Sequence, residues 1–225
     1  MELFLDIETI PSQKPEVYDD IMSNISPPGN IKKPESIAAW MEENAKEKAE
    51  DLWRKTALDG TLGEIVAIGW AANDTPAQCV FRHVGDSEAD LLDAFYHELK
   101  KVSGKGIPMF IGHNVKDFDL RFLFHRSVIL GVRPPFSLQT GKKNPYLFDT
   151  MTEWAGWGGR ISLDKLCKAL GVEGKTDGIN GSMVWDYVKE GRIGEVAEYC
   201  KGDVEAVRRV YRRMTFQEGW RAAWI

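Results

Sequence analysis

Two carboxylates lie two residues apart near the start of the chain, in Asp6-Ile7-Glu8. The alternation of apolar and polar residues from Glu2 to Glu8 predicts a β-strand, on which residues i and i+2 point to the same face. Both carboxylates would then be within reach of one hard cation such as Mg²⁺ or Mn²⁺. A pair of this kind also arises by chance, and for the pair alone two solvated acids on an edge strand are the simpler interpretation.

A third acid, Asp119, follows a glycine-containing turn. The apolar run Ile107 to Ile111 predicts a buried strand that ends at Gly112, and a helix from about Asp117 to Leu130 follows it. Asp119 falls in the first turn of that helix. An acid in this position can bind a cation, but it can also simply stabilise the helix N-terminus.

A fourth acid, Asp203, lies on the last predicted helix, Ile193 to Met214. Tyr199 precedes it by four residues, so the phenol and the carboxylate share one face of the helix. Taken alone, this pair is equally typical of a tyrosine at the edge of the core beside a surface acid.

The predicted elements around these residues indicate an α/β fold. Alternating patterns predict strands at Glu64–Ala72 and Gln78–Val84, joined as a hairpin, and a short strand at Tyr146–Phe148. Helical spacing predicts helices at Ser87–Val102 and Ser162–Leu170. Together with the strands above, these elements predict a mixed five-stranded sheet flanked by helices.

Length and composition favour one domain over residues 1–225, because 43% of the 225 residues are hydrophobic and can form one core. The proline-containing stretch Pro11 to Pro34 and a predicted charged helix, Pro34 to Leu58, indicate an inserted helical arm at about residues 27–60. The sequence leaves open whether this arm is a lid, a dimer contact or an exposed extension.

Charge and cysteine content narrow the class of protein. A net charge of −5 argues against a surface that binds nucleic acid everywhere, but not against a local basic groove. Cys79, Cys167 and Cys200 are too far apart for a usual zinc site, and we expect buried cysteines in a reduced compartment. The sequence has neither a membrane-length apolar run nor a leader pattern, which predicts a soluble cytoplasmic protein.

In this order, three segments resemble the exonuclease motifs of the DnaQ-like (DEDD) superfamily: Asp6-Ile7-Glu8-Thr9, His113-Asn114-x-x-x-Phe118-Asp119 and Tyr199-x-x-x-Asp203. The tyrosine four residues before the final aspartate resembles the DEDDy branch, which includes the proofreading domains of family A and family B DNA polymerases. The chain looks most like the stand-alone bacterial and phage proteins related to the family B exonuclease domain. The resemblance runs from Met1 to about Met214 and is weakest over Pro11 to Gly60.

The resemblance implies an RNase H-like fold and a 3′→5′ exonuclease that hydrolyses the terminal phosphodiester of DNA, at single-stranded or frayed 3′ ends, to release 5′-mononucleotides. Two Mg²⁺ or Mn²⁺ ions are expected per site. Asp6 would bridge them, Glu8 and Asp203 would complete the first and Asp119 the second. Tyr199 would orient the attacking water, because a phenol is protonated at neutral pH.

The same resemblance implies substrate contacts by five further residues, Thr9, Ile10, His113, Asn114 and Phe118. Asp149 resembles an extra acid of the family B group, with a structural and a supporting catalytic role equally open. A locally basic stretch surrounds Trp154 and Trp157 and would suit phosphate contacts and base stacking, although burial in the core is the favoured interpretation of the tryptophans. The basic residues are Lys142, Lys143, Arg160, Lys165 and Lys168.

Two alternatives to a DNA exonuclease remain at this point. An exonuclease that acts on RNA would use the same fold, because contacts to a 2′-hydroxyl cannot be recognised in the sequence. A domain without activity, which binds single strands or a partner protein, would have no chemical reason to keep all four acids and the tyrosine. Protein partners and the oligomeric state are not indicated by any pattern.

Overall fold

The computed structural model describes residues 1–104, 106–138, 145–174 and 178–218. Its centre is a five-stranded sheet with the strand order β3-β2-β1-β4-β5. β1 and β3 are both antiparallel to β2, whereas β4 is parallel to β1 and to β5. The predicted mixed sheet is therefore confirmed, and the chain has an RNase H-like α/β fold. The strands are β1 (Glu2–Ile10), β2 (Glu64–Ala72), β3 (Gln78–Phe81), β4 (Met109–Gly112) and β5 (Leu147–Asp149).

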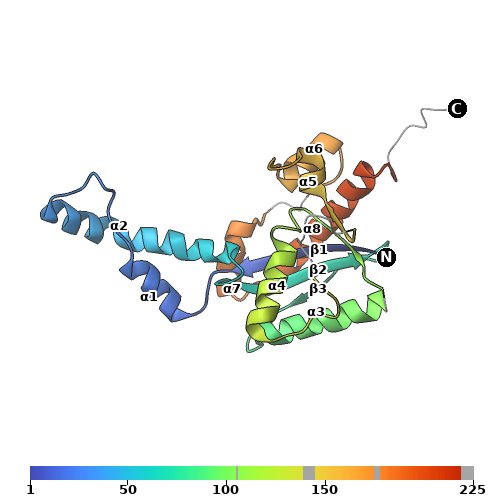
Figure 1. The fold of residues 1–225 in the computed structure, drawn as a ribbon, viewed down its shortest axis with the longest axis horizontal. Coiled ribbons are helices and arrows are strands. Elements are labelled where there is room, and N and C mark those ends of the chain that lie inside the picture. The colour runs from blue at the N-terminus through green and yellow to red at the C-terminus, as the bar shows by residue number, and fades with distance from the viewer. Residues whose placement is uncertain (105, 139–144, 175–177, 219–225) are drawn as a thin grey trace.

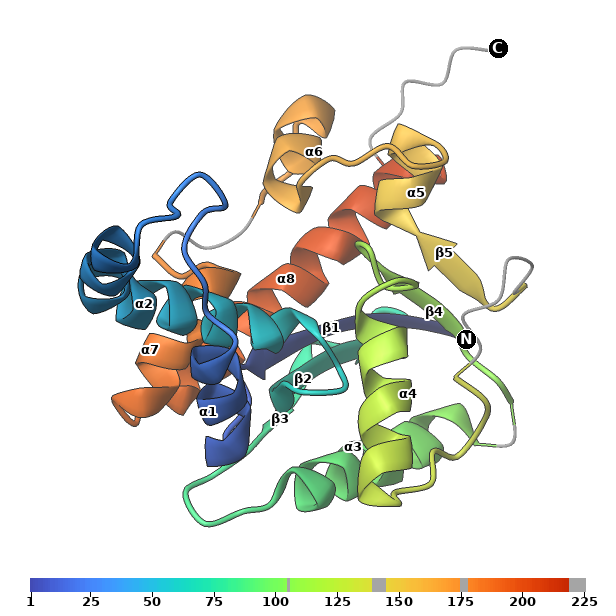
Figure 2. The same ribbon diagram turned by 60° about the vertical axis from the view of Figure 1, so that its left-hand side comes forward.

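Helices cover both faces of the sheet, and Figure 2 shows α3 and α4 on one side and α8 on the other. The long helix α8 crosses β2, β1 and β3. The helices are α1 (Pro15–Ser23), α2 (Pro34–Lys55), α3 (Glu88–Ser103), α4 (Asp119–Leu130), α5 (Thr150–Ala155), α6 (Leu163–Leu170), α7 (Val184–Lys189) and α8 (Ile193–Met214), with 3₁₀ turns η1 (Thr56–Leu58) and η2 (Gly181–Met183).

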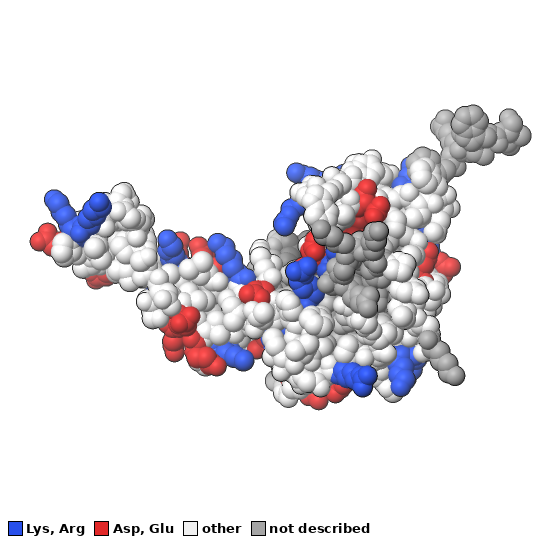
Figure 3. Space-filling model, viewed as in Figure 1, with Lys and Arg blue, Asp and Glu red and all other residues white. Residues whose placement is uncertain are grey.

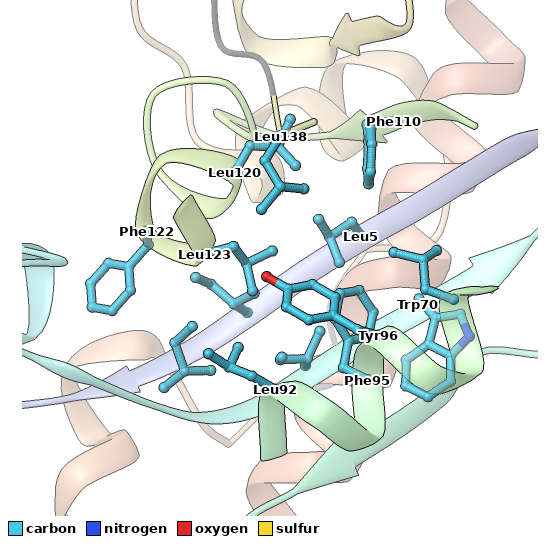
Figure 4. Packing of buried hydrophobic residues seen from close by; sticks show 14 of the residues in the cluster. Leu5, Trp70, Leu92, Phe95, Tyr96, Phe110, Leu120, Phe122, Leu123 and Leu138 are labelled. Atoms are coloured by element: carbon cyan, nitrogen blue, oxygen red, sulfur yellow. The ribbon is translucent and has the colours of Figure 1, made fainter. Parts of the chain in front are cut away.

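The alternation along β1 divides its side chains between the two layers, as predicted. Leu3, Leu5 and Ile7 join the core under α3 and α4, which Figure 4 shows from close by. Phe4 joins the separate core under α6 and α8. Because side chains of a strand alternate, Asp6 and Glu8 lie on the same face as Phe4. The sheet thus directs both acids toward α8.

A buried ion pair fastens the layer of α3 and α4 to the sheet. Arg126 of α4 and Glu88 at the start of α3 are both under 10% exposed, and Nη2 lies 2.5 Å from Oε2. Oε1 of Glu88 also accepts a hydrogen bond from the backbone N–H of Ile65, at 2.8 Å. One carboxylate therefore joins two helices and β2.

The helices α1 and α2 form a projection from one end of the sheet (Figure 1). Ala45 and Ala49 of α2 pack on Ile25 in a small cluster of their own. At the root of the projection, Arg54 makes two hydrogen bonds to Asp186 of α7, at 2.9 and 3.2 Å. The predicted helix Pro34 to Leu58 ends at Lys55 and continues as the 3₁₀ turn η1, while the helix α1 was not predicted.

Other boundaries differ from the sequence prediction for local reasons. β3 ends at Phe81 rather than Val84, whose side chain is 98% exposed and has no strand to pack against. The predicted strand from Ile107 starts only at Met109, where pairing with β1 begins. Short helices α5 and α7 were not predicted, because six residues are too few to show a helical period. Within the described ranges, no helix is both long and apolar enough to cross a bilayer.

Candidate active site

The two acids of β1 lie against α8 near the middle of the sheet. Asp6 is partly buried and Glu8 is 6% exposed. One potential ligand atom from each of Asp6, Glu8 and Cys200 lies within 4.8 Å of the other two. The register of β1 against β2 shifts between Glu8 and Thr9, which marks a β-bulge or irregularity directly after the second acid. The predicted pair therefore shares one face at the point where the strand becomes irregular.

Asp119 comes to β1 from the start of α4. Its Oδ1 accepts a hydrogen bond from the backbone N–H of Ile7, at 3.0 Å, and its side chain is 3% exposed. Burial raises the pKa of Asp119 to about 7, against the effect of its backbone hydrogen bonds, and the charges of Asp149 and Asp203 raise it further. The carboxyl group is thus held beside other acids in surroundings that oppose its charge.

Tyr199 and Asp203 lie one turn apart on α8, as the spacing predicted. Asp203 is 3% exposed and Tyr199 is 6% exposed. Burial raises the pKa of Tyr199 well above its ordinary value, and the charges of Asp203, Glu8 and Asp6, together with a hydrogen bond to Asp203, add to this effect. The phenol is therefore protonated at any physiological pH, and it lies within the field of three acids.

A cleft of about 540 Å³ opens over these acids. Asp6 and Asp203 line its floor, and the segment Arg160–Lys165 at the start of α6 forms one wall. The charge of Asp203 acts on the carboxyl group of Asp119, and the charge of Glu8 acts on the phenol of Tyr199. Both acids therefore lie near this group. The fold thus brings the four predicted acids, from β1, α4 and α8, near one another, and two of them, Asp6 and Asp203, line the cleft.

The chemistry of this donor set fits a hard divalent cation. Four carboxylates are concentrated where three of them are nearly buried, and uncompensated charge there is costly. The raised pKa of Asp119 expresses that cost. Carboxylate oxygens are the ligands that Mg²⁺ and Mn²⁺ prefer. A bound cation would remove the conflict that the acids create among themselves.

Asp149 supports the turn that leads to Asp119. Its carboxylate accepts hydrogen bonds from the backbone N–H groups of Asn114 and Lys116 in that turn, at 3.0 and 3.1 Å. It also accepts from the N–H groups of Met151 and Thr152, and thereby caps α5. Asn114 has a φ of +65°, a left-handed conformation that asparagine tolerates better than most residues. Four backbone donors thus give Asp149 a structural role, and its charge also raises the pKa of Asp119.

His113 lies in the cleft but its ring is already engaged. Nδ1 is 3.0 Å from the hydroxyl of Thr150, and Nε2 is 2.8 Å from the backbone carbonyl of Ile161. The ring therefore connects the end of β4 to α5 and to the wall that precedes α6. This placement gives His113 a role in positioning the wall.

The other residues expected to contact substrate differ in whether their side chains reach the cleft. Asn114 lines the cleft. The hydroxyl of Thr9 donates to the carbonyl of Ala57, at 2.7 Å. Ile10 is fully buried in a core cluster beneath α7, and Phe118 is partly buried against the core of α3 and α4. The side chain of Ile10 consequently points into the protein rather than into the cleft.

The exposure of the two tryptophans in the basic stretch differs from the prediction made from the sequence. Trp154 and Trp157 are 47% and 81% exposed, so the core role favoured from their type is wrong. The ammonium group of Lys116 lies 5.9 Å from the ring centre of Trp157. Of the basic residues, Arg160 and Lys165 line the cleft, whereas Lys142 and Lys143 lie outside the described residues. Figure 3 shows acidic and basic side chains interspersed on the face viewed. Basic side chains therefore do not form one continuous patch over that face.

Cys200 belongs to the site although its position in the sequence did not indicate this. Its sulfur lies 3.4 Å from both the backbone carbonyl oxygen and the Oδ2 of Asp6. The expectation that it is buried is confirmed, but its neighbours include a carboxylate. Its place directly after Tyr199 is the one signal that could have identified it.

Comparison with protein families matches most of the chain to a family model. The model of a family described as a predicted 3′-5′ exonuclease related to the exonuclease domain of PolB covers residues 56–221. The matched range contains Asp119, Tyr199 and Asp203 but begins after Asp6 and Glu8. Comparison with curated proteins gives no significant match.

Proposed function

The chain belongs to the family of predicted 3′-5′ exonucleases related to the exonuclease domain of PolB, and on that premise we propose a metal-dependent 3′→5′ exonuclease acting on DNA. It would hydrolyse the terminal phosphodiester of single-stranded or frayed 3′ ends and release 5′-mononucleotides. The observation that carries this proposal is the gathering of acids around one cleft. Asp6 and Glu8 lie outside the matched range, and yet Asp6 lines the cleft together with Asp203, and Glu8 lies beside Asp6.

In this proposal, Asp6, Glu8, Asp119 and Asp203 hold two Mg²⁺ or Mn²⁺ ions. Two such ions, when bound, supply an activated water and stabilise the charge on the leaving 3′ oxygen. The chain's own contribution is the arrangement of the acids. Asp119 is fixed by the Ile7 N–H group, and the two acids of β1 are fixed by the strand register.

Tyr199 would place the attacking water. Its phenol is protonated, because burial and three neighbouring acids raise its pKa, so it is unsuited to remove a proton. It can donate and accept hydrogen bonds beside Asp203, on the face of α8 that points to the acids. We therefore assign it the orientation of the nucleophile.

The substrate strand would enter along the wall that precedes α6. Arg160 and Lys165 offer positive charge to phosphate oxygens within the cleft. Exposed Trp157, beside Lys116, offers a stacking surface for an unpaired base. Stacking needs a base that is free of its partner strand, which favours single-stranded or frayed ends.

A nuclease assay tests the proposal. The protein is incubated with a 5′-labelled DNA strand and Mg²⁺ or Mn²⁺, beside Asp203→Asn and the control Asp164→Asn, an exposed acid of the same cleft. We expect a ladder of strands shortened from the 3′ end, absent with Asp203→Asn and with chelator, and unchanged with Asp164→Asn. No degradation of DNA with either metal would refute the proposal, and faster degradation of a ribo-oligonucleotide would transfer it to RNA.

A further inference from the structure

A row of aligned residues crosses the sheet at the site. Asp6 of β1 pairs with Gly69 of β2, and Gly69 pairs in turn with Cys79 of β3. Neighbouring strands are about 4.8 Å apart. Gly69 is thus the central member of the row Cys79–Gly69–Asp6, and it has no side chain to separate the other two.

The thiol of Cys200 occupies the space above that glycine. A Cβ atom at Gly69 would lie 2.9 Å from the Cys200 sulfur, closer than side chains normally approach. From there the sulfur contacts Asp6 on one side, at 3.4 Å, while the strand register places Cys79 directly beside Gly69 on the other side. Both cysteines therefore neighbour Gly69, with no side chain of that residue between them, directly beside a proposed metal ligand.

We propose that Cys79 and Cys200 are a redox-sensitive thiol pair, which a peroxide converts to a disulfide that takes Cys200 away from Asp6. Nothing in the proposed hydrolysis requires two adjacent thiols. α8 packs against β3, and cysteines on packed elements with no side chain between them can approach disulfide geometry with small movements of the backbone. The effect on activity rests on the proposed function, whereas disulfide formation does not.

The exposure of the two thiols sets the order of events. Cys79 is partly exposed and reacts first, while Cys200 is fully buried. The peroxide oxygen is transferred to the Cys79 sulfur, which gives a sulfenic acid and one water as the peroxide is reduced. The Cys200 sulfur then displaces the hydroxyl group, which leaves with the thiol proton as a second water, and the S–S bond forms.

The disulfide would change the site through Asp6. In the reduced protein the Cys200 thiol can donate to either oxygen of Asp6 that it contacts. When the sulfur turns toward β3, that contact is lost and α8, which also carries Tyr199 and Asp203, is drawn toward Cys79. Displacements of about 1 Å in a catalytic arrangement lower rates by on the order of 10²-fold.

The test is peroxide treatment of the reduced wild-type protein, followed by peptide mapping without reductant and by the exonuclease assay. We expect a peptide that joins Cys79 to Cys200, a fall in activity of on the order of 10²-fold, and recovery with dithiothreitol. Cys79→Ser should keep its activity before and after peroxide. The matched control, Cys167→Ser, should respond as the wild-type protein does, because Cys167 lies in the core beneath α6.

Two results would overturn the inference. One is the absence of a Cys79–Cys200 linkage under peroxide that oxidises Cys79 to other products. The other is an equal reversible loss of activity in Cys79→Ser. If the protein proves to have no nuclease activity, peptide mapping still shows whether the disulfide forms. The shift of melting temperature with Mn²⁺, before and after oxidation, still shows whether the disulfide changes cation binding.

Discussion

Replacing Asp119 by asparagine is predicted to stabilise the metal-free protein while it removes a metal ligand. The carboxyl group is 3% exposed, and its Oδ1 accepts a hydrogen bond from Ile7 that an amide oxygen can also accept. Asparagine keeps the shape but not the charge. The buried negative charge is therefore what the substitution removes.

The magnitude follows from the pKa of the Asp119 carboxyl group. Burial raises this pKa from 3.8 to about 7. Because each pKa unit is about 1.4 kcal/mol, the ionised group lowers the free energy of unfolding by on the order of 4 kcal/mol. A raised pKa means that the folded state is favoured at low pH. Stability is lost as the pH rises from about 4, the unfolded value, through about 7.

Urea denaturation with a chelator, at pH 8 and pH 5, measures this difference. Asp119→Asn should exceed the wild-type free energy of unfolding by a few kcal/mol at pH 8 and by less than half as much at pH 5. Asp117→Asn, an exposed aspartate two residues away, should change it by less than about 0.5 kcal/mol. With Mn²⁺ present, the wild-type protein should gain stability that Asp119→Asn does not. A variant no more stable than wild type at pH 8 would refute the reasoning.

Three further substitutions test other parts of the structure. Tyr199→Phe removes the hydroxyl beside the acids and should lower kcat by about 10²-fold with Mn²⁺ binding retained; unchanged steady-state kinetics would contradict its role. Arg126→Ala leaves Glu88 buried without its charge partner and should cost about 3–5 kcal/mol in denaturant unfolding, whereas the exposed control Arg121→Ala should cost under about 0.5 kcal/mol; equal costs would contradict a structural ion pair. Gly69→Ala places a methyl group 2.9 Å from a sulfur of α8 and should cost about 1–3 kcal/mol, and unchanged stability would show that α8 shifts freely.

Local sequence patterns predicted the elements that carry the site. The alternation in β1 correctly placed Asp6 and Glu8 on one face, and the long helix α8 has the predicted ends, Ile193 and Met214. Ser87, the first residue of the predicted helix, caps α3, since its hydroxyl accepts a hydrogen bond from the backbone N–H of Asp90. These features depend on residues close in sequence, so a single sequence contains them.

Features that depend on distant pairing were not predictable in the same way. The contact of Cys200 with Asp6 requires the register of three strands and a glycine beneath α8. Asp149 serves a turn 33 to 35 residues away along the chain, which no spacing rule indicates. The exposure of Trp157 opposes the usual preference of tryptophan for partial burial, because the turn around it is built from glycines rather than from core residues.

A calorimetric titration of the protein with Mn²⁺ tests most directly whether the gathered acids bind divalent cations. We predict saturable binding by the wild-type protein that Asp6→Asn abolishes and that Asp164→Asn, on the wall of the same cleft, retains. Equal binding by wild type and Asp6→Asn, or no binding by either, would contradict the account.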